Sequence, residues 1–418
     1  MAAAEPPATG GFFGMLSFRR SATAVASFDP AQDDELLALD ALQSHVADRL
    51  AALLSDAQQQ QGPVLSIGFL SKLLDSVCSS DASFRNVVAV APVAAALSRP
   101  PADRLARDLL DRSVKTLDVL NAASLTLASL RGAHRAALTA ASCLLPAPKS
   151  RAQFARARRA IARIGGDESN KLVSASPSAP SPCSRSMRAL SLSVSRNWSA
   201  GRHMNAMAAH LAPPPPLPSQ VGAGCGLGLT LYTMSSVLVF AMWALVAAVP
   251  CQDRASAAIN PPVAPPKQAQ WAQAMAALQD RIADEWRRKD KKLPPGSGGG
   301  GSSSSAIGTA GAGGLLAEMQ AVERAARDLN SLLEEIAEDD EEEVHGMVSE
   351  ERAREVTERA EELAAACRAL EEGLAPLERQ VRAVFHRVVS FRSDLVRCID
   401  NTARTNAAAS ATPQHHSF

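Results

Sequence analysis

Apolar side chains recur every three or four residues along most of the chain, which is the spacing of an amphipathic helix. In the N-terminal third, this spacing predicts one helix over residues 36–53, a second over 64–77 and a long third from Leu105 towards Leu145. A basic helix is expected at about 150–164. No segment shows the clear alternation of apolar and polar residues that marks a half-buried strand. The pattern therefore predicts an all-α fold.

The C-terminal third has the cleanest periodicity, because apolar positions lie alternately four and three residues apart over 315–336 and 356–398. This spacing is typical of helices that pack along a narrow, coiled-coil-like seam. Gly373 and Pro376 fall inside the second run, and an interior proline removes a helix hydrogen bond. We therefore expect two helices that meet near residues 373–376 rather than one rod. The seam predicted to pair with a partner helix consists of Leu363, Leu370, Leu374, Leu377, Val381, Val384, Val388 and Phe391.

The centre of the chain differs, since residues 211–252 contain no Asp, Glu, Lys, Arg or His. A hydrophobic helix is predicted over residues 221–250, and a membrane span needs only about 20 apolar residues. A buried central helix of an α-helical bundle would also be apolar on all sides. We expect membrane association and leave open whether this helix spans the bilayer or is buried in protein. The predicted membrane segment includes Tyr232, Val237, Leu238, Val239, Phe240, Trp243, Leu245 and Val246.

Low-complexity segments separate the predicted helices and have too little apolar area to offset the entropy lost on ordering. The expected units are a disordered N-terminus (1–33), an N-terminal helical region (34–172), a Ser/Pro-rich linker with a basic segment (173–220), the hydrophobic helix (221–250), a Pro-rich segment with an amphipathic helix (251–293), a Gly/Ser linker (294–314), a C-terminal helical hairpin or coiled coil (315–402) and a disordered tail (403–418). We therefore predict a helical bundle with long coiled-coil-like C-terminal helices and disordered linkers.

Composition and charge narrow the choice of partners. The chain has 418 residues, of which 46% are hydrophobic but only 4% aromatic, which argues against β-sandwiches and barrels. The formal net charge is zero, yet residues 151–210 contain ten Lys or Arg against Asp167 and Glu168. Residues 331–351 contain ten acids and no Lys or Arg. Such opposite charge blocks indicate either internal neutralisation or two different partners.

An anionic membrane surface is the partner that we favour for the basic block, because basic residues beside an apolar segment attract acidic lipids of the cytosolic leaflet. Nucleic acid is the weaker alternative, since aromatic side chains in this region are limited to Phe154 and Trp198 and no DNA-binding motif is present. We therefore expect a cytoplasmic, membrane-associated protein on the cytosolic face, single-pass if the apolar helix spans, and no nucleic-acid partner. The predicted lipid-facing residues are Arg185, Arg188, Arg196 and Arg202.

Residues for catalysis or ligand binding form no recognisable pattern. The eight His show neither an HExxH motif nor a metal-ligand spacing, and residues 222–228 lack the Lys-Ser/Thr of a P-loop. The seven Cys are widely spaced and include no CxxC pair, which favours reduced thiols in a cytosol-facing protein. The N-terminus does not resemble a secretory signal. We predict no catalytic residues, no cofactor, no metal and no small-molecule substrate.

Five segments carry a family resemblance: FFGMLSFRR (12–20), LLDRSVKTLDVLN (109–121), SLSVSRNWSA (191–200), YTMSSVLVFAMWALVAAVPCQD (232–253) and LEEGLAPLERQVRAVFHRVV (370–389). Together they resemble the plant BYPASS-related proteins of the ROH type. The resemblance implies an all-helical protein that is not an enzyme, with no catalytic or ligand residues to transfer. It also implies one membrane helix at the segment that matches residues 232–249.

Proteins of the ROH type are described as binding exocyst subunits, which tether secretory vesicles to the plasma membrane during polarised deposition of wall material. The leading hypothesis is therefore a non-enzymatic helical interaction protein of the plant secretory pathway. It would bind an exocyst subunit at a membrane and regulate polarised exocytosis and cell-wall deposition. The resemblance to BYPASS members leaves one alternative, a regulator of a root-derived mobile developmental signal.

Overall fold

The computed structural model describes most of the chain and shows helices throughout these parts. The described residues are 30–60, 62–97, 99–100, 102–146, 150–164, 199–213, 226–249, 262, 265–291, 314–339 and 349–410. They contain ten α-helices and no β-strand. The prediction of an all-α fold is therefore confirmed. Most of the predicted disordered termini and linkers lie outside the described residues.

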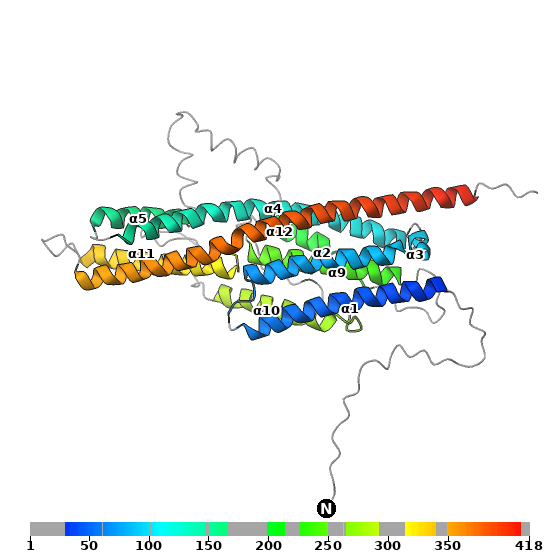
Figure 1. Cartoon of the computed structure of the whole chain (residues 1–418), viewed down its shortest axis with the longest axis horizontal. Helices are drawn as coiled ribbons and strands as arrows, with labels where there is room; N and C mark the ends of the chain where they lie inside the picture. Colours follow the sequence, from blue (N-terminus) through cyan, green and yellow to red (C-terminus); the bar gives the residue numbers. More distant parts are fainter. Residues whose placement is uncertain are drawn as a thin grey trace, which may run out of the picture.

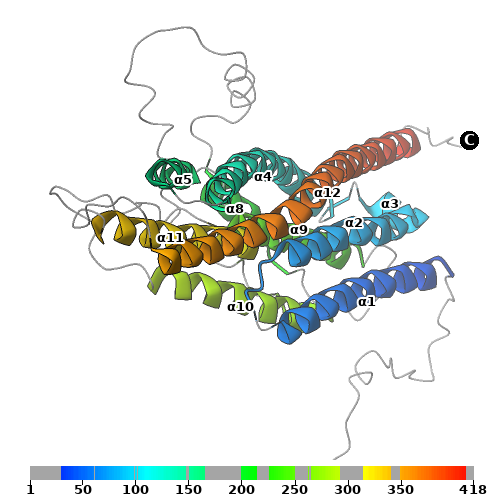
Figure 2. The same ribbon diagram turned by 60° about the vertical axis from the view of Figure 1, so that its left-hand side comes forward.

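The helices pack side by side into an elongated bundle, in which α4 and α12 lie against each other (Figures 1 and 2). The helices are α1 (Pro30–Gln59), α2 (Ile67–Ala89), α3 (Ala91–Ala96), α4 (Ala102–Leu144), α5 (Arg151–Ile164), α8 (Ala200–Ala208), α9 (Leu227–Ala248), α10 (Ala272–Lys291), α11 (Ala317–Asp339) and α12 (Glu350–Ser410). Contacts between α4 and α12 show that the two run antiparallel. Arg131 forms an ion pair with Glu378, whereas Leu110 accepts a hydrogen bond from Arg392.

Local and distant side chains cap α2 and α9. The Ser66 hydroxyl accepts a hydrogen bond from the Phe69 backbone N–H, and the Glu318 carboxylate at the start of α11 accepts one from Ile67 N–H at 3.0 Å. At the start of α9, the buried Glu35 carboxylate of α1 accepts a hydrogen bond from Gly226 N–H at 2.9 Å. Negative charge at a helix N-terminus satisfies unpaired N–H groups and complements the helix dipole. These caps fix where α2 and α9 begin relative to α11 and α1.

Helix α9 is the central helix of the bundle and contacts α1, α2, α4, α8 and α10. In the described part of the chain, it alone is long and apolar enough to cross a membrane, and its apolar stretch is completely buried inside the fold. The eight residues predicted as a membrane segment are each at most 6% exposed. Of the two alternatives that the sequence leaves open, this arrangement is the buried central helix, whose side chains face protein on every side.

Three buried polar side chains join α9 to its neighbours on one side. Gln43 of α1 donates a hydrogen bond to the Thr233 hydroxyl at 2.8 Å and accepts one from the Trp271 indole N–H at 2.8 Å. Trp271 is fully buried just before α10, and its ring stacks on Tyr232 of α9. Buried polar groups cost free energy unless they are hydrogen-bonded, so this chain of bonds selects one register for α1, α9 and α10.

The expected break near residues 373–376 is wrong, because α12 continues through Pro376 as one helix. Pro376 lies on the exposed face of α12, so water can reach the carbonyl that loses its hydrogen bond to the proline. An interior proline costs about 3 kcal/mol. The buried leucines around it, Leu374 and Leu377, each stabilise the folded state by about 1.5–3 kcal/mol. Packing therefore outweighs the local penalty.

The predicted seam of α12 is filled by the chain itself. Each of its eight residues is at most 4% exposed, and α12 packs against α2, α4 and α11. The seam is therefore part of the hydrophobic core, and in this fold it offers no free surface to a partner helix. The alternating four- and three-residue spacing identified these positions as buried. It could not show whether the helix that covers them belongs to this chain or to another protein.

Gly373 marks the closest approach of α12 to the start of α2. A Cβ atom at this position would lie 2.7 Å from Ile67 Cδ1 and 2.9 Å from Ile67 Cγ2. Glycine is therefore required by the close packing of the two helices, although it lowers intrinsic helix stability.

We expect Gly373→Ala to lower the free energy of unfolding by about 1–3 kcal/mol, because the added methyl group overpacks the contact with Ile67. Gly132→Ala in α4 is the matched control, since a Cβ atom there has no neighbour within 4 Å. The control should raise stability by up to about 1 kcal/mol through helix propensity alone. Urea unfolding of both variants measures the difference, and equal stabilisation by the two substitutions would contradict the close approach.

Candidate interaction surface

The described polar side chains form no metal site and include no activated thiol at the one cysteine of the seam. Among these residues, no group of three or more His, Cys, Asp or Glu side chains could hold a metal ion. Cys367 is buried in the seam, and burial raises the pKa of its thiol to about 11. At neutral pH this thiol is protonated and serves as a packing side chain. Besides Glu35, the buried charged side chains of the described residues include Arg112 and Asp81.

Arg112 of α4 is 5% exposed and holds the C-terminal end of α8. Its guanidinium donates hydrogen bonds to the carbonyls of Met207 at 3.0 Å and Ala209 at 3.2 Å, and to the Ser235 hydroxyl of α9 at 3.4 Å. Burial lowers its pKa from the ordinary value of arginine. A cation at a helix C-terminus complements the dipole and satisfies terminal carbonyls. Arg112 therefore ties α4, α8 and α9 together and has a structural role.

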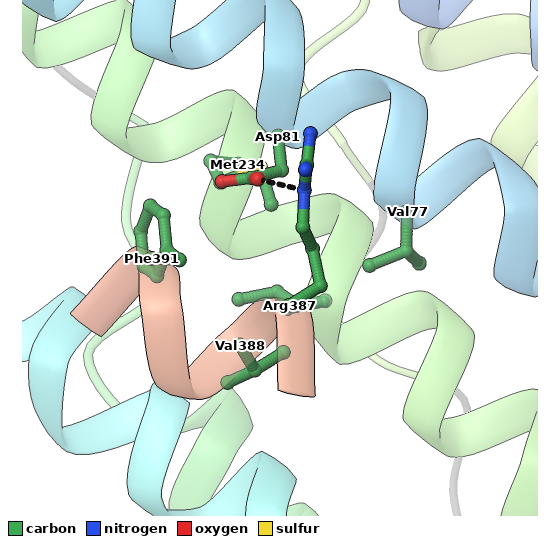
Figure 3. Close-up of a pocket in the computed structure, with 7 residues that line it drawn as sticks. Val77, Asp81, Met234, Arg387, Val388 and Phe391 are labelled. Carbon is green, nitrogen blue, oxygen red and sulfur yellow. Dashed lines mark ion pairs between the residues drawn. The ribbon is translucent and has the colours of Figure 1, made fainter. Parts of the chain in front are cut away.

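Asp81 of α2 is 2% exposed and lies between two arginines, of which Figure 3 shows Arg387. Arg85 Nε donates to Asp81 Oδ2 at 2.9 Å, and Arg387 of α12 forms an ion pair with the same oxygen at 2.5 Å. A cavity of about 10 Å³ adjoins the carboxylate and is otherwise lined mainly by apolar side chains, including Met234 and Phe391. This volume fits about one water molecule and excludes a larger ligand. The cluster therefore joins α2 to α12 without forming a substrate site.

Burial raises the pKa of Asp81 above its ordinary value and outweighs the hydrogen bonds and charges of Arg85 and Arg387, which lower it. The side chains of these arginines are 31% and 41% exposed, so water weakens their field at the carboxylate. The buried carboxylate thus costs free energy at neutral pH despite its two partners.

The outer surface carries a second set of apolar side chains. Large hydrophobic residues with substantial exposure, apart from Leu37 of α1, lie on α4, directly after it, or on α12 within the described ranges. They are Val114 and Leu138 of α4, Leu145 directly after α4, and Val389 and Val396 of α12, with exposed fractions of 39%, 40%, 41%, 40% and 36%. An exposed apolar cluster with polar neighbours is a common mark of a protein or membrane contact.

Val389 and Val396 belong to a stripe on α12 beside the buried seam. The stripe also includes the half-buried Phe385 and Ile399, and its members share a helix face with Arg392. Arg392 donates a hydrogen bond to the Leu110 carbonyl of α4 at 3.4 Å, so this face of α12 borders α4. Val114 lies one turn beyond Leu110 on α4. We define the outer apolar strip as Phe385, Val389, Val396 and Ile399 of α12 with Leu110, Val114 and Leu117 of α4.

Only one of the four predicted lipid-facing arginines belongs to the described residues. Arg202 is exposed on α8, while Arg185, Arg188 and Arg196 lie outside the described residues. The sequence prediction did not include the outer apolar strip, because it considered only the seam residues with alternating four- and three-residue spacing. The signal was present, since residues 385, 389, 396 and 399 also have helical spacing, one position beyond seam residues.

We expect Asp81→Asn to change the pH dependence of stability. Because the pKa of Asp81 is raised in the folded chain, its carboxyl favours folding below the ordinary value of 3.8 and loses this contribution as the pH rises through the raised pKa. The free energy of unfolding of the variant relative to wild type should therefore increase with pH, by at most about 1.4 kcal/mol per pH unit. Urea unfolding at several pH values above 3.8 measures this trend. Parallel profiles for the two chains would contradict it.

Comparison with known proteins places this sequence in a family. The family model for "Protein ROH1-like" matches residues 3–186 and 175–399. Protein ROH1A of Arabidopsis thaliana is 31% identical, over 95% of this chain and 97% of its own length. Protein ROH1D of the same plant is 33% identical, over 91% of this chain and 94% of its own length. No solved structure matches the chain. Because both the model and these relatives cover most of the sequence, the chain belongs to the ROH1-like family of BYPASS-related plant proteins.

Proposed function

We propose that this protein is a non-enzymatic helical interaction protein of the plant secretory pathway. It binds an exocyst subunit at a membrane and thereby regulates polarised exocytosis and cell-wall deposition. An exocyst subunit is the partner implied by the resemblance to proteins of the ROH type. The observation that carries the proposal is the outer apolar strip, which exposes hydrophobic side chains of α4 and α12 along one boundary.

The strip has the chemistry of a docking site for a helix. Its residues on α12 are four, seven and three positions apart on one helix face, with Arg392 between Val389 and Val396, and present apolar area along several turns. An amphipathic helix of a partner with apolar residues at similar spacing could cover them. Each Å² of apolar surface removed from water contributes about 25 cal/mol before the costs of association. Arg382 and Arg397 are exposed on the same half of α12 and could form a polar rim.

Membrane attachment is peripheral in this proposal. The apolar residues of α9 are occupied by contacts with other helices, so lipid would have to replace protein contacts that hold the core together. Attachment through exposed side chains leaves this core intact. It also keeps both ends of the bundle on the same side of the membrane, where a cytosolic partner can reach them.

The double variant Val389→Asp/Val396→Asp should weaken binding to the exocyst subunit at least tenfold, because it places charges in the centre of the proposed interface. Leu37→Asp is the matched control, since Leu37 is 71% exposed on α1 and lies outside the strip. The control should bind like wild type. Affinities for each purified exocyst subunit would be measured by biolayer interferometry, with melting temperatures to verify folding.

Two results would contradict the proposal in different ways. If wild-type protein binds none of the subunits, the exocyst is the wrong partner. If wild type and the double variant bind equally well, the exocyst assignment stands but the outer apolar strip is not the interface.

A further inference from the structure

The C-terminal half of α4 and all of α5 form a hairpin without acidic residues. Between Val119 and Gly166, the sequence contains no Asp or Glu, whereas arginines are frequent. The two helices pack against each other, and Figures 1 and 2 show α5 at the outer edge of the bundle. Positive charge on this hairpin is therefore not offset by acids within it.

Helix α5 separates its apolar and basic residues onto opposite faces. Phe154, Ala157, Ala160 and Ile161 are buried, and they hold the helix against the bundle. Arg156, Arg159 and Arg163 are exposed and are spaced three and four residues apart, so they form one outer stripe. The direction of this stripe follows from the packing of the apolar face.

Some arginines of the hairpin face neighbouring helices instead. Arg158 of α5 forms an ion pair with Glu334 of α11 at 3.4 Å. Arg131 of α4 pairs with Glu378 of α12 at 2.6 Å. These pairs attach the hairpin to acidic residues of α11 and α12. The stripe formed by Arg156, Arg159 and Arg163 lies on a different side of α5 from Arg158.

Helix α4 adds basic and apolar side chains to the outer surface. Arg135 and Leu138 of α4 and Leu145 directly after it are exposed and have the spacing of one helix face, and the two leucines are 40% and 41% exposed. The same face carries Arg131, so it lies beside α12. We define the basic hairpin face as Arg135, Leu138 and Leu145 together with Arg156, Arg159 and Arg163 of α5. It combines positive charge with exposed leucines near the C-terminal end of α4.

We propose that the basic hairpin face binds the surface of an anionic phospholipid membrane. The arginines contact lipid phosphates and carboxylates, while Leu138 and Leu145 enter the boundary between headgroups and acyl chains. This inference deepens the membrane attachment of the proposed function and assigns it to particular side chains. The face is separate from the outer apolar strip, so the chain can bind lipid and a protein partner at once.

A membrane fits this face better than a nucleic acid does. Single-stranded nucleic acids are bound by exposed aromatic rings on which bases stack. The aromatic residue of α5, Phe154, is 6% exposed and packs inward. Exposed leucines among the arginines would make no favourable contact with the phosphate backbone of a nucleic acid. Their partial insertion into lipid would remove apolar surface from water and so favour binding. A membrane surface also does not require the basic side chains to match a fixed spacing of phosphates, so a simple stripe of charges is sufficient.

The test uses the full chain and vesicles of phosphatidylcholine with about 30% phosphatidylserine, compared with vesicles of phosphatidylcholine alone. Wild type should bind the anionic vesicles and not the neutral ones. The triple variant Arg156→Glu/Arg159→Glu/Arg163→Glu should bind at least about a hundredfold more weakly, because losing each basic residue near an anionic surface costs roughly fivefold and the new carboxylates add repulsion. Binding of wild type should also fall as salt rises from about 0.1 M to 1 M, which shortens the Debye length from about 10 Å to 3 Å.

The matched control is Arg379→Glu/Arg382→Glu/Arg404→Glu, which changes the net charge equally at exposed positions of α12. It should retain most of the vesicle binding. Leu138→Ser/Leu145→Ser should weaken binding severalfold without changing its salt dependence. Melting temperatures close to that of wild type would show that the variants remain folded, and the milder Arg156→Gln/Arg159→Gln/Arg163→Gln should give an intermediate loss.

Each remaining outcome identifies a different error. Equal losses from the two Glu triples would mean that net charge alone acts, and the hairpin assignment would be wrong. Full vesicle binding by the α5 triple, with loss of its protein partner, would make this face a protein-docking site. If wild type does not bind anionic vesicles at all, both this inference and membrane attachment fail. Exocyst binding, measured separately, would then be unaffected.

Discussion

The burial of α9 is the interaction on which the arrangement of the other helices depends. Its side chains are apolar on every side, so removing them from water requires neighbours all around the helix. Helices α1, α2, α4, α8 and α10 supply these neighbours from widely separated parts of the sequence. Specificity comes from a few buried polar contacts at its surface, through Glu35, Gln43 and Arg112. Hydrophobic burial thus provides the stabilising free energy, while the polar contacts select one register.

Sequence periodicity predicted the helices well because most of them bury one regular stripe. It failed at Pro376, where the local cost of a proline was visible but the compensating contacts with distant helices were not. It also could not decide the environment of α9, since a uniformly apolar helix suits lipid and a protein core equally. That choice depends on whether enough other apolar stripes exist to surround it. Here α1, α2, α4, α8 and α10 together form the enclosure.

The candidate interaction surface was harder to predict than the core for a related reason. Buried seam residues and the outer apolar strip lie next to each other on α12, and both have helical spacing. Only the packing of α4 shows where the core ends and the exposed strip begins. The basic block could be recognised from charge alone, yet only the position of α11 shows that Arg158 pairs with Glu334. Surfaces are thus defined by what neighbouring helices leave uncovered.

Chain order has a consequence for synthesis of the protein. Helices α2 and α4 emerge from the ribosome well before α12, yet both complete their packing with it, through contacts such as the hydrogen bond from Gln380 to the Ser71 carbonyl. Contacts of such long sequence separation form slowly. A nascent chain therefore exposes the apolar faces of α2 and α4 that α12 will cover for as long as the last third is being translated. Chaperones that shield such segments should be needed during translation and become dispensable once α12 has docked.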